Sequence, residues 1–128
     1  MKEIAIGVIL GLTSILLSLL FSLEQQSEIW GFLMIIIASI YIGFGISDGR
    51  IKEMITEIIA GSIFIILAIL GIWESTYFLV IAYIGHGFWD IIHKPKLVDT
   101  NVQKWYPKFC MFYDWVIGLW LIYLIIIN

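Results

Sequence analysis

Five apolar runs, separated by three short polar links and one long one, decide most of what this chain can fold into. A helix needs about 17 to 25 predominantly apolar residues to cross the hydrocarbon core of a bilayer. Hydrophobic residues make up 62% of the chain and charged residues 13%, with a mean hydropathy of +1.04. The runs are residues 4–23, 29–47, 55–73, 77–92 and 109–127. The sequence therefore predicts one all-α domain, residues 1–128, built as a bundle of five transmembrane helices in the cell membrane.

The cationic residues indicate how such a bundle is oriented. They are Lys2, Arg50, Lys52, Lys94, Lys96, Lys104 and Lys108. With five spans they all lie on one side, whereas the other side carries Glu24, Glu28 and Glu74 and no cation. The positive-inside rule then places the N-terminus in the cytoplasm and the C-terminus outside. Four spans with one re-entrant run would split this charge pattern between the two sides.

Both histidines of the protein lie in the fourth run or directly after it. His86, Asp90 and His93 are four and three residues apart, so on a helix they share one face, with Trp89 beside them. Ionisable residues inside a membrane are costly and normally face a partner or a cavity. This face therefore predicts a polar site in the cytoplasmic half of the bundle.

The second, third and fifth runs also place acidic residues in the cytoplasmic part of the predicted bundle. Asp48 directly follows the second run, Glu57 lies about one turn into the third, and Asp114 lies about one turn into the fifth. Carboxylates held close together repel unless a proton or a cation compensates them, and histidine with carboxylates is a ligand set of zinc, manganese and non-haem iron. We therefore predict a divalent metal site (zinc or iron/manganese). The predicted ligands are His86, Asp90, His93, Asp114 and Glu57, with Asp48, Cys110 and Trp89 in support.

Spacing limits how such a site could be built. His86 and His93 are seven residues apart, which is about 10 Å along a helix. One ion is therefore not expected to bind both histidines. Asp90 lies one turn from each, so it could pair with either histidine or bridge two ions.

A metal-free interpretation stays open. His86 and Asp90 could form a hydrogen-bonded pair within the membrane, and His93 could extend to the headgroups. Asp48 could start a turn and pair with Arg50. Asp114 could stabilise the first turn of its helix through the helix dipole.

These residues favour a membrane metalloenzyme that acts on a lipid-like substrate, as a hydrolase or an oxidoreductase. Zinc would activate water and iron would activate oxygen, with Glu57 and Asp90 as the catalytic carboxylates and Glu57 as ligand or general base. The alternatives are a proton- or cation-coupled transporter or channel subunit, and a non-catalytic membrane subunit with a structural polar cluster. Membrane lipids are expected partners. Nucleic acid is not, because membrane topology explains the lysines.

The first run carries a stripe of small residues. They are Gly7, Gly11, Ser14 and Ser18, spaced by three or four residues. Such a stripe lets another helix approach closely. Packing within the monomer is the simpler interpretation, and association into a homo-oligomer through this stripe is the alternative.

Several of these motifs together resemble a group of small bacterial and archaeal membrane proteins of unknown function. The shared pattern is His-Gly-x-Trp-Asp-x-x-His, a basic linker with proline, Trp-Tyr-Pro-x-x-Cys and a later Asp. It matches residues 86–93, Lys94-Pro95, residues 105–110 and Asp114, and Asp48-Gly49-Arg50 and Glu57 also match. The resemblance supports the choice of site residues and implies no reaction. Members often have a further histidine where this chain has Lys94.

Overall fold

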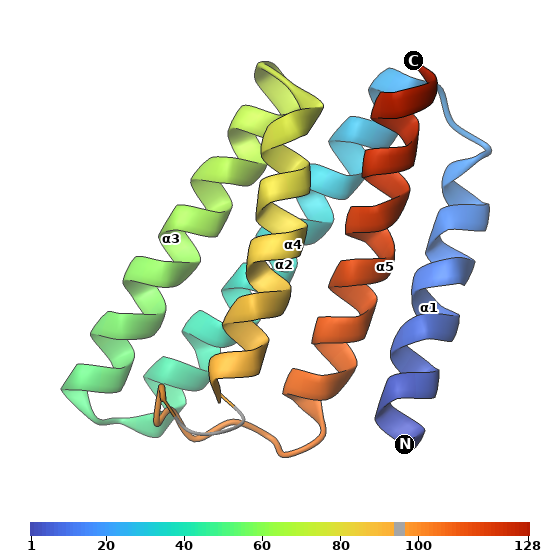
Figure 1. Ribbon diagram of the computed structural model, residues 1–128. Helices are drawn as coiled ribbons and strands as arrows, with labels where there is room; N and C mark the ends of the chain where they lie inside the picture. Colours follow the sequence, from blue (N-terminus) through green and yellow to red (C-terminus); the bar gives the residue numbers. More distant parts are fainter. Residues whose placement is uncertain (94–96) are drawn as a thin grey trace.

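The computed structural model describes residues 1–93 and 97–128, which form five α-helices and no strand (Figure 1). The helices are α1 (Lys2–Ser18), α2 (Leu23–Asp48), α3 (Ile51–Trp73), α4 (Thr76–His93) and α5 (Tyr106–Ile127). They run alternately up and down, so the two termini lie at opposite ends of the bundle. The predicted all-α fold is confirmed.

Three of these helices are long and apolar enough to cross a membrane. They are α2, α3 and α5. The prediction of five spans is therefore supported for three helices and not for five. α1 has only 17 residues, and α4 has 18 residues that include His86, Asp90 and His93. Short length in α1 and buried polar residues in α4 explain the difference.

The boundary between the first two helices differs from the prediction. The first apolar run extends to residue 23, but α1 ends at Ser18 and α2 begins at Leu23. Ser22 caps α2 with a capping box: its hydroxyl accepts from the Gln25 backbone N–H at 3.2 Å, and Gln25 Oε1 accepts from the Ser22 N–H at 3.1 Å. The Ser-x-x-Gln spacing is a helix-start signal hidden inside an apolar run.

The helices pack in the order α1, α5, α4, α3, α2, and α2 also contacts α4. α1 approaches α5 through glycines. A Cβ added at Gly7 would lie 2.5 Å from the backbone oxygen of Phe109, and one at Gly11 would lie 2.9 Å from Val116 Cγ1. The small-residue stripe therefore packs within the monomer. Association of two chains through it stays a prediction.

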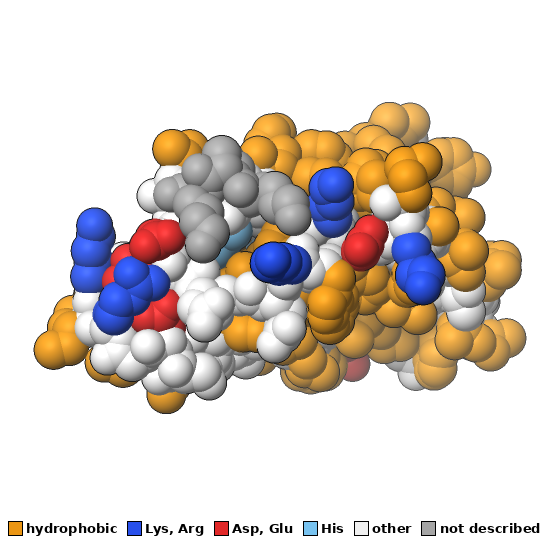
Figure 2. All heavy atoms as spheres, turned by 90° about the horizontal axis from the view of Figure 1, so that it is seen from below, with side chains coloured by type: hydrophobic (Ala, Val, Ile, Leu, Met, Phe, Trp, Pro, Cys, Tyr) orange, Lys and Arg blue, Asp and Glu red, His pale blue; other side chains and the backbone are white. Residues whose placement is uncertain are grey.

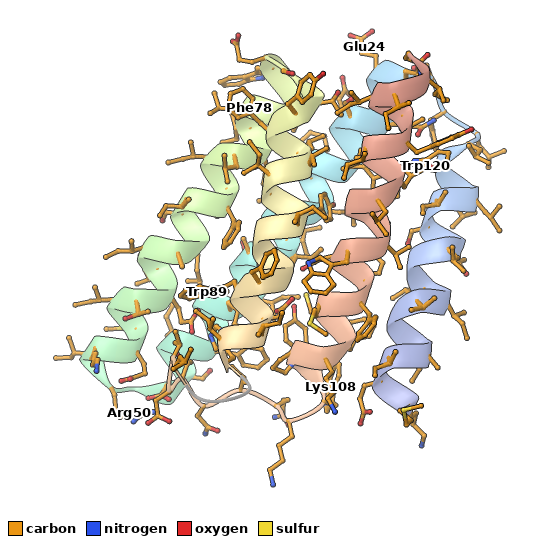
Figure 3. All side chains as sticks on the ribbon, viewed as in Figure 1. Glu24, Arg50, Phe78, Trp89, Lys108 and Trp120 are labelled. Atoms are coloured by element: carbon orange, nitrogen blue, oxygen red, sulfur yellow. The ribbon has the colours of Figure 1, made fainter. Side chains whose placement is uncertain are left out.

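The two ends of the bundle differ in charge. We call one the cationic end, because every cationic residue in the described ranges lies there (Figures 2 and 3). These residues are Lys2, Arg50, Lys52, Lys104 and Lys108; Lys94 and Lys96 lie outside the described residues. Glu24 lies at the opposite end. This segregation follows the predicted charge pattern, while the direction of insertion into a membrane stays a prediction.

Candidate metal centre

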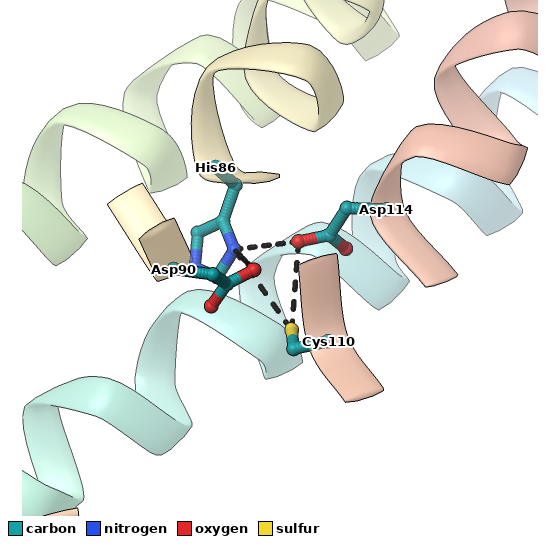
Figure 4. A group of neighbouring side chains, drawn as sticks. All are labelled: His86, Asp90, Cys110 and Asp114. Carbon is teal, nitrogen blue, oxygen red and sulfur yellow. Dashed lines mark hydrogen bonds and ion pairs between the residues drawn. The ribbon is translucent and has the colours of Figure 1, made fainter. Parts of the chain in front are cut away.

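Two neighbouring helices bring four potential metal ligands together in the half of the bundle nearer the cationic end. His86 and Asp90 lie one turn apart on α4, and Cys110 and Asp114 lie one turn apart on α5 (Figure 4). One donor atom from each of the four lies within 4.8 Å of the others. Their side chains are closed off from the surface, with relative exposures of 0% to 2%. We call these four residues the His86 cluster.

The distances within the His86 cluster are close to those of a four-coordinate ion. His86 Nδ1 lies 2.7 Å from Asp114 Oδ2 and 3.6 Å from Asp90 Oδ2, while Cys110 Sγ lies 3.5 Å from Asp114 Oδ2 and 4.0 Å from His86 Nδ1. Ligand bonds of about 2.0–2.3 Å place the donors of a tetrahedral zinc ion about 3.3–3.7 Å apart. The shortest contact is a hydrogen bond from His86 to Asp114, which an ion would replace.

The cluster leaves buried polar atoms without a hydrogen-bond partner. Within the described residues, these include His86 Nε2, Asp90 Oδ2 and Asp114 Oδ1. Unpaired polar atoms in a protein interior are rare because each costs roughly 1–3 kcal/mol. Asp90 Oδ2 lies 3.6 Å from His86 Nδ1, so it is an acceptor that a cation at the cluster would satisfy.

Close packing of α4 on α5 holds the cluster together. A Cβ at Gly87 would lie 2.1 Å from Trp115 Nε1, and one at Gly118 would lie 2.5 Å from Ile84 Cδ1. The Trp115 ring is fixed by a hydrogen bond from Nε1 to the backbone oxygen of Ile84, at 3.2 Å. Glycine on each helix thus lets the opposite helix come near enough for the donors to meet.

A second polar cluster lies between α3, α4 and the segment before α5. We call it the Glu57 cluster; it consists of Glu57, Trp89, His93 and Thr100. Three side chains contact the Glu57 carboxylate: Trp89 Nε1 donates at 3.2 Å, Thr100 Oγ1 donates at 2.6 Å, and His93 Nε2 lies at 2.7 Å. His93 Nδ1 donates to the backbone oxygen of Trp89 at 2.7 Å. Both ring nitrogens of His93 therefore already have partners.

Tyr41 on α2 connects the two clusters. Its hydroxyl donates to Asp90 Oδ1 at 2.5 Å, which leaves Asp90 Oδ2 free to face the other donors. Its ring lies 4.5 Å from the His93 ring and 5.4 Å from the His86 ring, measured between centroids. A bond of this kind orients a carboxylate that binds an ion.

Asp48 lies apart from both clusters, at the end of α2. Its carboxylate accepts from Arg50 Nε at 2.7 Å and from the Asn101 backbone N–H at 2.7 Å. Arg50 Nη1 also reaches Asp99 Oδ2 at 3.0 Å. Hydrogen bonds to Asp48 and Asp99 raise the pKa of the Arg50 guanidinium above its ordinary value. Asp48 thus pairs with Arg50, as the metal-free interpretation predicted.

The predicted site residues are therefore divided between three places. His86, Asp90, Asp114 and the supporting residue Cys110 come together, whereas Glu57, His93 and Trp89 form the adjacent cluster and Asp48 lies at the helix end. A metal-binding role for Glu57 and His93 stays a prediction. Tyr41 and Thr100 were not predicted. Tyr41 stands in an apolar run seven residues before Asp48, and Thr100 stands in a loop with no motif around it.

Comparison with known proteins identifies the family of this chain. The family model described as "Family of unknown function (DUF6010)" matches residues 2–126. The chain belongs to the DUF6010 family. No curated protein and no solved structure matches the chain.

The DUF6010 match extends over all five helices, so it includes both polar clusters and the segment between α4 and α5. It agrees with the resemblance of the sequence to a family of unknown function. It assigns no activity, so a function for this DUF6010 protein has to be argued from the site itself.

Proposed function

We propose that this protein is a multi-pass membrane metalloprotein that binds one divalent transition-metal ion at the His86 cluster. All five helices would lie in the membrane, with the N-terminus in the cytoplasm and the ion in the cytoplasmic leaflet. One observation supports the proposal above others: four buried side chains from α4 and α5 bring their donor atoms within 4.8 Å of one another.

The charges of the cluster favour a bound cation over a hydrogen-bonded network alone. Two carboxylates, Asp90 and Asp114, lie beside a single histidine, which can carry at most one positive charge. Burial of uncompensated charge is costly. A divalent ion would offset most of the negative charge of Asp90, Asp114 and a Cys110 thiolate, and it would engage Asp90 Oδ2, which has no hydrogen-bond partner.

The donor set favours zinc or iron(II). Cys110 contributes sulfur and His86 contributes nitrogen, whereas calcium, magnesium and manganese favour oxygen ligands. Zinc is commonly four-coordinate with nitrogen, sulfur and carboxylate oxygen ligands. Four protein ligands complete that coordination, so the arrangement suits an ion that is held firmly. Tyr41 would support it by orienting Asp90.

Catalysis on a lipid-like substrate is the second candidate function. The observation that favours it is the Glu57 cluster, which Tyr41 joins to the His86 cluster. A bound zinc ion supplies a Lewis acid and an activated water, provided that one of the four ligands leaves its position open. Glu57 would act as general base, its carboxylate oriented by Trp89 and Thr100.

Metal analysis of the purified protein tests the proposal. We expect close to one zinc or iron ion per chain after purification in detergent, and restoration of that content by zinc or iron(II) after chelation. We also expect bound metal to raise the free energy of unfolding by about 4 kcal/mol when the free ion is 1,000-fold above its Kd.

The alternatives give different results in the same experiments. A structural polar cluster would bind no ion stoichiometrically, and the free energy of unfolding would not depend on metal. A transporter or channel subunit would conduct protons or cations across liposomes, and the flux would be lost in Asp90→Asn. Failure of the wild-type protein to take up any transition metal would contradict the proposed function.

A further inference from the structure

The His86 cluster is enclosed, so an ion needs a route to it. A groove of about 550 Å³ opens at the cationic end. One wall is the end of α2, with Phe44, Ser47 and Asp48, and the other is the segment 101–105. A second cavity, of about 350 Å³, is lined by Leu121, which lies two turns above Asp114 on α5. The groove lies on the side of the cluster that is closer to the surface.

Within the described residues, a layer of aromatic rings lies between the groove and the His86 cluster. We call Tyr41, Phe44 and Tyr106 the aromatic layer. Phe44 lines the groove and packs on Tyr106 at 5.3 Å and on Tyr41 at 5.9 Å between ring centroids. Tyr41 binds Asp90, and Tyr106 lies one turn before Cys110 on α5. Phe44 thus lies against the groove, whereas Tyr41 and Tyr106, on which it packs, lie against the cluster residues Asp90 and Cys110.

The aromatic layer also contains a buried hydroxyl next to the His86 cluster. Tyr106 is 5% exposed, and its hydroxyl interacts with the thiol of Cys110, one of the four potential ligands. An ion that passes the layer would find an oxygen ligand there.

The outer wall of the groove is held in place by bonds to α2 and α3. The Asn101 N–H donates to Asp48 at 2.7 Å, and Arg50 bonds Asp99 at 3.0 Å. Thr100 is buried and donates to Glu57 at 2.6 Å. The segment therefore crosses the cationic end of the bundle in a fixed position (Figure 1). Since the wall is fixed, passage would depend on movement of the rings.

We propose that the groove is the entrance through which a divalent cation reaches the His86 cluster, and that Phe44 and Tyr106 form the gate. This inference rests on the proposed function, because it needs an ion at the cluster. Rotation of the Phe44 ring opens the layer toward Tyr106, Cys110 and Asp90 in turn. A gate controls how fast the ion enters and leaves, and leaves the affinity of the cluster unchanged.

Exchange kinetics test the gate. Cobalt(II) binding and its extraction by a chelator are followed by stopped flow in Phe44→Ala and in the matched control Phe32→Ala, which alters an exposed ring on the same helix. We expect both rates to rise about tenfold in Phe44→Ala, equivalent to about 1.4 kcal/mol of barrier, with Kd changed by less than about threefold. The control should match the wild type.

A second variant tests the gate independently, in case Phe44→Ala does not fold. Ser47→Trp fills the groove from an exposed position on α2 and is expected to slow both rates about tenfold with Kd unchanged. Unchanged rates in both variants would overturn the gate, as would a weaker Kd without faster exchange. If the wild type binds normally while the rates stay unchanged, the gate alone is wrong; if the wild type binds no cobalt or zinc, the proposed function fails.

Discussion

Replacement of Asp114 by asparagine is expected to lower zinc affinity by about 100-fold or more. Structural zinc sites bind with about 10–16 kcal/mol shared among four ligands, so loss of one charged ligand removes about 3 kcal/mol. Asp114 contacts both His86 and Cys110 through Oδ2, at 2.7 and 3.5 Å. The variant therefore loses the donor that touches two others. Competition with a chelator of known affinity measures the change.

Glu74→Gln is the matched control for this substitution. It also converts a carboxylate to an amide, but Glu74 is exposed at the end of α3, far along the bundle from the cluster. Zinc should raise the free energy of unfolding of the wild type and of Glu74→Gln, and should not raise that of Asp114→Asn. An Asp114→Asn protein that binds zinc with wild-type affinity would remove Asp114 from the site.

Replacement of Gly87 by alanine is expected to lower the free energy of unfolding by about 1–3 kcal/mol, the usual cost of overpacking. The added Cβ would lie 2.1 Å from Trp115 Nε1, in a ring that is hydrogen-bonded to Ile84. α4 and α5 would have to separate beside His86. Metal affinity should therefore fall together with stability, although no ligand is changed.

Gly43→Ala is the control, because a Cβ at Gly43 meets no atom within 4 Å. Alanine has a higher helix propensity than glycine, so this variant should gain up to about 1 kcal/mol. Both changes are measured by denaturant unfolding in detergent, with and without zinc. Equal effects at Gly87 and Gly43 would mean that close contact of α4 with α5 does not hold the cluster together.

Most of the His86 cluster could be predicted from the sequence, because helix geometry places its members in pairs on shared helix faces. The spacing of His86 and Asp90 puts them on one face, and Cys110 shares a face with Asp114 for the same reason. The antiparallel arrangement of α4 and α5 then brings the two pairs together. Cys110, predicted only as a supporting residue, is one of the four residues whose donor atoms lie within 4.8 Å of one another.

The division of the remaining residues depends on tertiary contacts. Two helical turns separate His93 from His86, and the spacing already indicated that one ion would not bind both. The partner of His93 is Glu57 on α3, which no local pattern specifies. Thr100 could not be predicted either, since its role depends on how a loop crosses the end of the bundle.

Fold prediction was limited by hydropathy at two places. Apolar residues continue through the turn after Ser18, so hydropathy does not indicate where α1 ends. The start of α2 is indicated by the capping box of Ser22 and Gln25. The polar site residues lower the hydropathy of α4, and α1 has only 17 residues, so three helices and not five meet the length and composition of a span.

The absorption spectrum of the cobalt(II)-loaded protein tests the metal centre most directly. Cobalt(II) bound to a thiolate gives an intense charge-transfer band in the near ultraviolet, and tetrahedral coordination gives strong visible bands. The wild type should show both, with saturation at one cobalt per chain, and Cys110→Ser should lose the charge-transfer band while it keeps the visible bands. A wild-type spectrum identical to that of cobalt in buffer would contradict a metal ion at His86, Asp90, Cys110 and Asp114.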